Sequence, residues 1–394
     1  MQDLNIAIVG AGLGGLVTAA ALNMLGYEVD VYEQAAELGE IGAGLSLPPN
    51  STRVLEHLGL KDALARFGNI PDRTIVKHFK SGEVLLTRPR ERYLEKYGCN
   101  YYFTHRADVH DLLVKLVMKN NPAGIHTAHA VIDVADKGPH VELRFANGKS
   151  ATADIVIGCD GIHSVVRDKL FEPEPPYFTH QVAYRSLVPW DLLDKDPRVD
   201  VASIDDSAVM TVGPDHWINL YPARHHEMVN CVAMVKTSKW EEEGWSNHAD
   251  IAEILSEFKE FHDEVQAVLR TIPPDTSYKW GMFVRKPLSR WSSGRVSLLG
   301  DAAHGMLNFL GQGAAMAIED AMVLARCIKE SDDHLEAFAR YEQARIERTH
   351  LVQVESDARG PRLQTHTPDD YDNKAHRNDE DLGLFDYNAM TVPI

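Results

Sequence analysis

Cysteine is scarce in this chain of 394 residues, which has only Cys99, Cys159, Cys231 and Cys327. The four lie far apart, with no CxxC pair and no histidine at metal-ligand spacing. The sequence therefore predicts neither a disulfide framework nor a metal site. Such cysteine usage is typical of a reducing compartment, and we expect a cytoplasmic protein.

Positive charge and long apolar runs are also in short supply. Lys and Arg total 40 against 58 Asp and Glu, which gives a net charge of −18 at pH 7. Nucleic acid and anionic lipid surfaces repel such a chain, so we expect neither as a partner. No apolar run reaches the roughly 18 residues of a membrane span, and the N-terminus lacks the features of a signal peptide. We expect a monomer or homodimer that binds small molecules.

The first 33 residues contain a strong fold signal. Residues 4–9, "LNIAIV", predict a buried strand, the run from Gly14 to Gly26 predicts a buried helix, and "EVDVYE" predicts a second strand that ends at Glu33. This order is the βαβ unit of a doubly wound α/β fold with a parallel sheet.

Gly10, Gly12 and Gly15 form the pattern G-x-G-x-x-G between the first strand and the helix. Such glycines permit a tight turn, close approach of the backbone to a pyrophosphate, and close helix packing, while the amides of the helix N-terminus face the phosphates. The Glu33 carboxylate can accept hydrogen bonds from ribose hydroxyls and disfavours a 2′-phosphate. The pattern thus predicts FAD or NAD rather than NADP, with a purely structural turn as the alternative.

The rest of the chain divides by composition into four parts. Residues 1–177 predict the first pieces of a Rossmann-type domain, and residues 178–275, where aromatic strands alternate, predict an inserted antiparallel sheet that binds substrate. Residues 276–356 return to the first domain and end in a helical region. Residues 357–394 are polar and acidic, and we expect a loosely packed tail.

Six segments in order carry a resemblance to a known family. They are "GAGLGG", "YEQ", "GAGLSLPPN", "HRADVHDLL", "GCDGIHSVVR" and "GDAAH…GQGAAMAIEDA", and they run from residue 5 to about residue 350. The chain resembles the FAD-dependent aromatic hydroxylases, in the branch with salicylate hydroxylase and the hydroxybenzoate and hydroxynicotinate monooxygenases.

This resemblance implies a monooxygenase that uses NADH and molecular oxygen to hydroxylate a small aromatic acid by way of a flavin hydroperoxide. The substrate would be of the salicylate, hydroxybenzoate, aminobenzoate or hydroxynicotinate type. Two alternatives stay open: a flavin-dependent dehydrogenase or oxidase that inserts no oxygen, and a non-catalytic, redox-responsive FAD-binding protein.

The resemblance also assigns residues to a non-covalently bound FAD. Gly14 and its neighbours would hold the pyrophosphate, Glu33 with Gln34 the adenosine ribose, and Asp301 a ribityl hydroxyl. The other implied cofactor contacts are Leu45 through its backbone, Arg106 near the phosphates and ribityl chain, Val131 beside the adenine, Asp160 between the flavin and nicotinamide sites, and Gly313 with Ala314 at a helix N-terminus that faces the flavin. His105, His110 and His304 are interpreted as hydrogen-bonded scaffold.

The chain departs from the family pattern at two places, and both bear on catalysis. Many relatives read H-P-M-x-P where this chain reads "HGMLN", so Asn308 replaces a proline and is predicted either to hydrogen-bond the substrate or only to satisfy a turn. In "GPDHWINLYPAR", strand alternation places Trp217 and Tyr221 toward the substrate and His216 on the opposite side. His216 could be the catalytic base only if a β-bulge reset the register.

Overall fold

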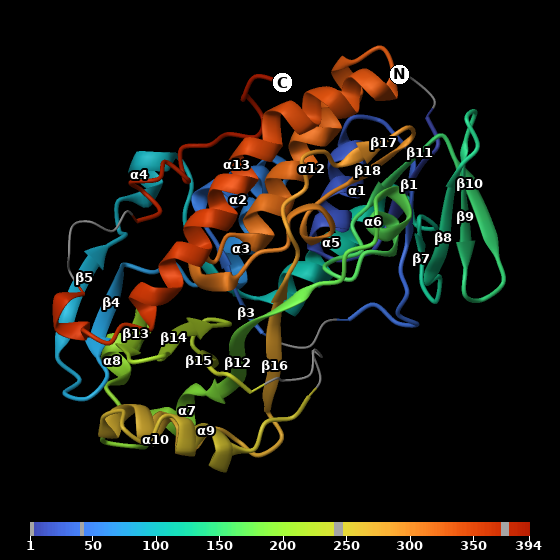
Figure 1. The fold of residues 1–394 in the computed structure, drawn as a ribbon. Helices are drawn as coiled ribbons and strands as arrows, with labels where there is room; N and C mark the ends of the chain where they lie inside the picture. The colour runs from blue at the N-terminus through green and yellow to red at the C-terminus, as the bar shows by residue number, and fades with distance from the viewer. Residues whose placement is uncertain (1–3, 40–42, 240–246, 372–377) are drawn as a thin grey trace.

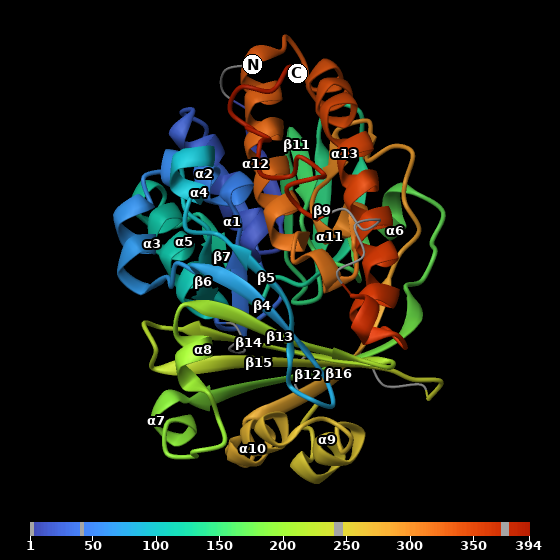
Figure 2. The same cartoon turned by 90° about the vertical axis from the view of Figure 1, so that its left-hand side faces the viewer.

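The computed structural model describes residues 4–39, 43–239, 247–371 and 378–394. A domain of helices around a parallel sheet lies against one face of a large, mostly antiparallel sheet, and short helices cover the outer face of that sheet (Figures 1 and 2). The α/β fold with a parallel sheet and a second, antiparallel sheet is the one that the sequence predicts.

The parallel sheet has six strands. In spatial order they are β17 (Ser292–Ser293), β18 (Val296–Leu298), β11 (Ile155–Gly158), β1 (Ile6–Val9), β2 (Val29–Tyr32) and β7 (Ile125–His126). All neighbours pair in parallel except β17 and β18. Strand β1 is buried along its whole length, as expected for a central strand of a parallel sheet that is covered on both faces.

Helix α1 (Leu13–Met24) follows the glycine-rich turn and contacts α5 (Arg106–Asn120) and α12 (Gly313–Glu330). It is apolar on most sides, and nine of its residues are buried. A helix with this pattern is stable only inside a packed layer. The predicted strand, turn, helix and strand are therefore all present.

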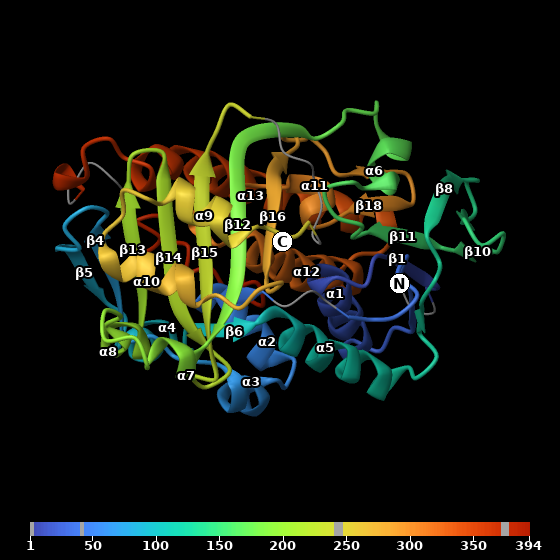
Figure 3. The ribbon, with the colours of Figure 1, turned by 90° about the horizontal axis from the view of Figure 1, so that it is seen from below.

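Two smaller sheets flank this core. The three-stranded sheet lies at one end of the molecule (Figure 3). It contains β8 (Val131–Asp136), β9 (Val141–Phe145) and β10 (Ser150–Ala153), and the two-stranded sheet pairs β3 (Gly44–Leu47) with β6 (Tyr102–His105).

The large sheet has seven strands. In spatial order they are β16 (Ser277–Val284), β12 (Tyr177–Pro189), β15 (Met228–Lys236), β14 (His216–Ala223), β13 (Ser207–Gly213), β4 (Arg73–His78) and β5 (Val84–Pro89). The predicted bounds of 178–275 are too narrow for this sheet, because β4 and β5 precede them and β16 follows them. Strand β4 pairs in parallel with β13, Ile75 opposite Val209, a contact between segments that lie far apart in the sequence.

Helices complete both layers. The remaining ones are α2 (Pro49–His57), α3 (Lys61–Phe67), α4 (Tyr93–Tyr97), α6 (Val165–Leu170), α7 (Trp190–Leu193), α8 (Val201–Asp205), α9 (Ile251–Glu257), α10 (Asp263–Thr271), α11 (Asp301–His304) and α13 (His334–Leu363), with 3₁₀ turns η1 (Asn308–Leu310) and η2 (Pro368–Asp370). Helices α9 and α10 lie on the outer face of the seven-stranded sheet (Figure 2).

The predicted loosely packed tail is wrong for the described residues after 378. Leu384, Phe385 and Ala389 are buried. The Arg53 guanidinium donates to the carbonyl oxygens of Tyr387, at 2.6 Å, and Phe385, at 3.3 Å. Glu380 accepts hydrogen bonds from tyrosines of α4 and from Lys96. The acidic composition of this segment supplies ion pairs and hydrogen bonds to the body of the protein.

Candidate active site

The glycines of the first turn are required for two different reasons. Gly10 has φ +102°, and a Cβ there would lie 2.5 Å from the Cys159 carbonyl oxygen, while a Cβ on Gly15 would lie 2.0 Å from the Gly10 oxygen. These two positions are closed by the protein itself. By contrast, a Cβ on Gly12 would meet no atom of the described residues within 4 Å. The space beside Gly12 fits a pyrophosphate held by the N-terminus of α1.

Glu33 lies directly at this turn. Its carboxylate accepts hydrogen bonds from the backbone N–H of Ala11 and of Ala35, both at 2.8 Å. Each carboxylate oxygen keeps further acceptor capacity, which suits ribose hydroxyls. Gln34 is exposed beside it, and Val131 is buried at the start of β8.

Five of the predicted cofactor residues line one cavity, which has a volume of about 300 Å³. They are Leu45 on β3, Arg106 at the start of α5, Asp301 at the start of α11, and Gly313 and Ala314 at the start of α12. Helix α12 begins at Gly313 as predicted, so its positive N-terminal end faces the cavity and favours negative charge there. The Asp301 side chain is available, because this residue is exposed in the cavity wall.

Asp160 does not line this cavity. Its carboxylate accepts from the Ser164 hydroxyl at 2.5 Å and from the Val166 N–H at 3.1 Å, and therefore closes the turn before α6. Burial raises the pKa of this carboxyl. Its predicted role between the flavin and nicotinamide sites stays a prediction.

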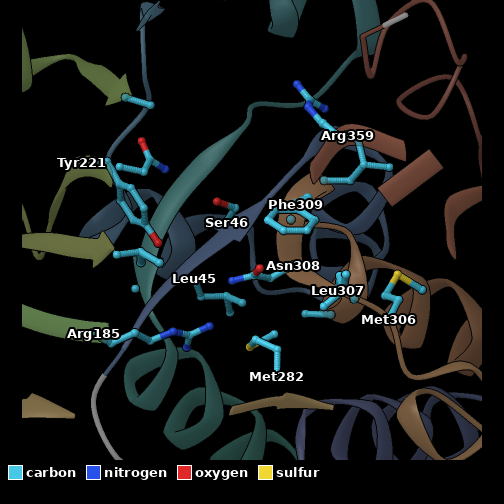
Figure 4. A pocket seen from close by; sticks show the side chains of 18 of the residues that line it. Leu45, Ser46, Arg185, Tyr221, Met282, Met306, Leu307, Asn308, Phe309 and Arg359 are labelled. Carbon is cyan, nitrogen blue, oxygen red and sulfur yellow. The ribbon is translucent and has the colours of Figure 1, made fainter. Parts of the chain in front are cut away.

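The seven-stranded sheet supplies the opposite wall of the cavity. Trp217, Asn219 and Tyr221 of β14 all point into it, as strand alternation predicts. Figure 4 shows Asn308 near the centre of the cavity, with Tyr221 and Arg185 on one side and Phe309 and Leu307 on the other. The cavity thus lies between the sheet and the FAD-motif segments.

Buried polar atoms without a hydrogen-bond partner among the described residues gather at this cavity. They are Thr74 Oγ1, Arg90 Nε and Nη1, Arg185 Nε, Trp217 Nε1, Asn219 Oδ1 and Asn308 Oδ1. Each buried polar group left unpaired costs about 1–3 kcal/mol. Both donors and acceptors are present, so the cavity suits a ligand that itself carries donors and acceptors.

Arg185 and Trp280 are site residues that the sequence reasoning missed. The Arg185 guanidinium lies over the Trp280 ring, with its Cζ 4.6 Å from the ring centroid. Burial lowers the pKa of Arg185 to about 10, so the group stays cationic at pH 7. A single charged residue in the mostly apolar strand segment "VAYRSLV" is the signal that could have identified it.

Asn308 opens the turn η1 and lines the cavity. Its Oδ1 has no partner in the described ranges, and its Nδ2 lies 4.0 Å from the Met234 sulfur. Among the described residues, the Asn308 side chain therefore makes no hydrogen bond to the backbone of the turn. Tyr221 also faces the cavity, and burial raises the pKa of its hydroxyl, which stays protonated as a donor.

His216 is not placed to be a catalytic base. The register of β14 runs without a shift from His216 to Leu220 against β13 and from His216 to Ala223 against β15, so no bulge turns the side chain inward. Its Nδ1 donates to the Pro214 oxygen at 2.8 Å, and its Nε2 lies 3.2 Å from a Glu257 carboxylate oxygen on the outer face. The prediction of His216 as a catalytic residue is wrong because strand alternation is unbroken.

The three histidines that were predicted to be structural make contacts within the protein. His110 Nε2 donates to the Ala11 oxygen at 2.8 Å, and His304 Nε2 lies 2.5 Å from the buried Asp320 carboxylate. His105 Nδ1 accepts from the Arg224 guanidinium at 3.3 Å. Among the described residues, no histidine lines the cavity.

A nucleotide-binding turn and a polar, cationic cavity beside it define a cofactor-dependent enzyme. The FAD binding domain family matches residues 3–352. A 6-hydroxynicotinate 3-monooxygenase from Pseudomonas fluorescens is 35% identical over 100% of this chain and 97% of its own length. A 3-amino-4-hydroxybenzoate 2-monooxygenase from Streptomyces platensis is 36% identical over 92% and 89%. The chain therefore belongs to the FAD-dependent aromatic hydroxylases, and it is a flavoprotein monooxygenase that binds FAD.

Solved structures agree with this family. Klebsiella pneumoniae HpxO, complexed with FAD and uric acid, has a TM-score of 0.84 and 25% identity and covers 98% of this chain and 96% of its own. A salicylate hydroxylase substrate complex has a TM-score of 0.81, covers 98% and 96%, and at 24% identity shows the same fold. Within the described ranges, no helix has the length and apolar character to cross a bilayer.

Proposed function

We propose that this enzyme uses NADH and molecular oxygen to hydroxylate a small aromatic acid. The observation that most supports this proposal is the cavity, which is lined both by residues of the FAD motifs and by Arg185 and other side chains with unpaired polar atoms. The names of its relatives support this class, because they describe hydroxylated or amino-substituted aromatic acids.

FAD would be held by the Gly12 turn, Glu33, Asp301 and the N-terminus of α12. Bound there, it supplies the redox chemistry, accepting electrons from NADH and activating molecular oxygen. The binding is non-covalent in this proposal, because neither cysteine nor histidine lines the cavity in the described part of the chain.

Arg185 prepares the aromatic ring for attack on activated oxygen. Its charge is buried, so it acts strongly on a neighbouring ring hydroxyl and favours the ionised form of that hydroxyl. An ionised hydroxyl makes the ring electron-rich. Because His216 lies on the other face of the sheet, no histidine accepts the proton in this proposal; the lowered pKa lets the hydroxyl release its proton to solvent water.

Asn308, Asn219 and Trp217 orient the substrate. The two amide oxygens accept from a hydroxyl or amino group, and the indole N–H donates to a substrate oxygen. Leu307, Phe309 and Met282 complete the wall with apolar groups and exclude water. The protein thus contributes orientation, charge and a dry environment.

Labelled oxygen tests this function directly. Hydroxylated and amino-substituted aromatic acids are screened for stimulated NADH oxidation under ¹⁸O₂, and product mass is measured alongside. We expect one labelled atom per product. Substrate oxidation without label would instead identify a dehydrogenase or oxidase, and no stimulation by any aromatic acid would favour the non-catalytic alternative. Equal or higher efficiency with NADPH would reject the choice of reductant, and flavin that stays on the denatured chain would reject non-covalent binding.

A further inference from the structure

One end of the cavity contains none of the residues assigned to FAD. It is lined by Arg90 after β5, Tyr101 before β6, Thr74 on β4, and Arg359 on α13 with Asp379 of the C-terminal segment. In Figure 4, Arg359 lies at the opposite side of Asn308 and Phe309 from Arg185. We call these five residues the Arg90 compartment.

Arg90 is the unusual group of this compartment. Its Nε and Nη1 atoms are buried and have no hydrogen-bond partner in the part of the chain that the structure describes. Its guanidinium lies over the Tyr101 ring, 4.4 Å from the centroid, and 5.9 Å from that of Tyr93. Stacking on aromatic rings and a side-chain hydrogen bond to Tyr101 hold the cation in place, and Nε and Nη1 stay available as donors.

The acid in the compartment is already engaged. Asp379 accepts from Arg359 at 2.6 Å, and both side chains are mostly buried. Together, Arg90, Arg359 and Asp379 leave one positive charge in excess. Asp379 also attracts the Arg90 cation, but a single carboxylate balances only one of the two guanidinium groups, so the excess positive charge favours an anionic ligand group.

Aromatic rings connect this compartment to the residues proposed to orient the substrate. Tyr221 stacks on Phe103 with 4.3 Å between centroids, and Phe103 contacts Tyr101 edge-on at 5.4 Å. All three residues line the same cavity. The wall between the two ends is therefore a continuous aromatic surface that suits a flat or extended apolar portion of a ligand.

We propose that the Arg90 compartment binds a carboxylate that the substrate carries on a side chain, away from the ring that is hydroxylated. The inference rests on the proposed function and narrows its substrate class to hydroxyaryl-alkanoic acids. In this arrangement Arg185 acts on the ring hydroxyl and Arg90 on the acid group. The two cations at opposite ends of one cavity thereby set the orientation of the substrate.

Binding of matched ligands to the FAD-loaded protein tests the proposal without turnover. The probes are 3-(4-hydroxyphenyl)propanoate, its neutral amide, and 4-hydroxybenzoate, whose carboxylate is on the ring. Titration calorimetry gives each Kd. We expect the propanoate to bind about tenfold or more tighter than either other probe, the scale of a hydrogen bond to a charged group.

Arg90→Gln should remove this preference, weakening the propanoate about tenfold or more while changing the amide by about twofold or less. Arg90→Lys should retain part of it. The matched control is Arg92→Gln, because Arg92 is 76% exposed and pairs with Glu95 at the surface, so this variant should bind all three probes like the native protein.

Equal affinity of the native protein for the propanoate and the amide would overturn the proposal. This comparison uses only the native protein, so it does not depend on whether a variant folds. Equal weakening of both ligands by Arg90→Gln would overturn it as well. Failure of the proposed function gives a different result: the preference for the propanoate stays, but no aromatic product contains labelled oxygen.

Discussion

The glycine turn and the substrate cavity lie in one molecule but satisfy their atoms in opposite ways. At the turn, the Glu33 carboxylate is hydrogen-bonded to backbone amides, and Gly10 and Gly15 are packed against backbone atoms. In the cavity, Arg185 and Asn308 have buried polar atoms with no partner among the described residues. The turn is nearly complete without a ligand, whereas the cavity is not.

This difference explains why the turn can be recognised from the sequence, whereas the cavity gives information about its ligand. A preformed turn binds one common cofactor and therefore appears as a sequence motif. A cavity with unpaired donors and acceptors reflects its particular ligand, because each unpaired group is a place where that ligand must supply a partner. Substitutions can therefore distinguish residues that stabilise the fold from residues that bind the cofactor or the substrate.

The largest effect is expected from the glycines of the turn. Gly15→Ala places a Cβ on the Gly10 oxygen, so it should destabilise the apoprotein by about 3 kcal/mol or more and abolish FAD retention. Gly12→Ala should change the stability of the apoprotein by about 0.5 kcal/mol or less but weaken FAD binding on the order of a hundredfold. Thermal unfolding and flavin titration measure the two effects. Tight FAD binding by Gly12→Ala would show that FAD binding does not require a glycine at this position.

Arg185→Gln should lower kcat/KM at pH 7 on the order of a hundredfold while FAD content is unchanged. Loss of the cation raises the pKa of the bound ring hydroxyl, so less of it is ionised at neutral pH. The rate should therefore recover as pH rises, with the midpoint of the profile displaced upward by roughly two pH units. Arg185→Lys should recover part of the activity. A pH profile with an unmoved midpoint would contradict the assigned role.

Asn308→Ala should keep FAD and keep substrate-stimulated NADH oxidation, but divert much of the reducing power to hydrogen peroxide. Loss of one neutral hydrogen bond costs about 0.5–1.5 kcal/mol of binding, whereas displacement of the ring by about 1 Å can slow hydroxylation far more. The ratio of product to NADH consumed measures this. Asn308→Pro should be uncoupled too, and complete coupling in both variants would make Asn308 only a turn residue.

The smallest effect is expected at His216. His216→Ala should change kcat/KM by about twofold or less, because the ring lies on the outer face beside Glu257 and Phe258. Loss of this partly exposed pair should cost about 1 kcal/mol of stability or less. Steady-state kinetics and thermal unfolding provide the comparison. A hundredfold loss of kcat with intact folding would restore His216 as a catalytic candidate.

Local pattern was sufficient to predict much of the cofactor-binding part. The βαβ unit, the start of α12 at Gly313 and the inward face of Trp217 and Tyr221 all follow from short-range rules of periodicity and turn chemistry. Such rules act over a few residues, so a single sequence expresses them clearly.

Long-range pairing and burial of charge could not be predicted in this way. The pairing of β4 with β13 depends on segments far apart in the sequence. Lone arginines such as Arg90 and Arg185 look like solvated surface until the fold shows where they lie. The packing of the acidic C-terminal segment could not be predicted either, because its partners Arg53 and Lys96 are distant in the chain.

The parallel pairing of β4 with β13 also has a consequence for how the chain is made. During synthesis, β4 and β5 emerge well before the strand on which they must pair, so a nascent chain exposes an unpaired edge for that interval. Contacts of such large sequence separation form slowly. Exchange of residues 178–275 alone between relatives would separate these partners, so chimeras should be built with β4, β5 and β16 transferred together with the rest of the sheet.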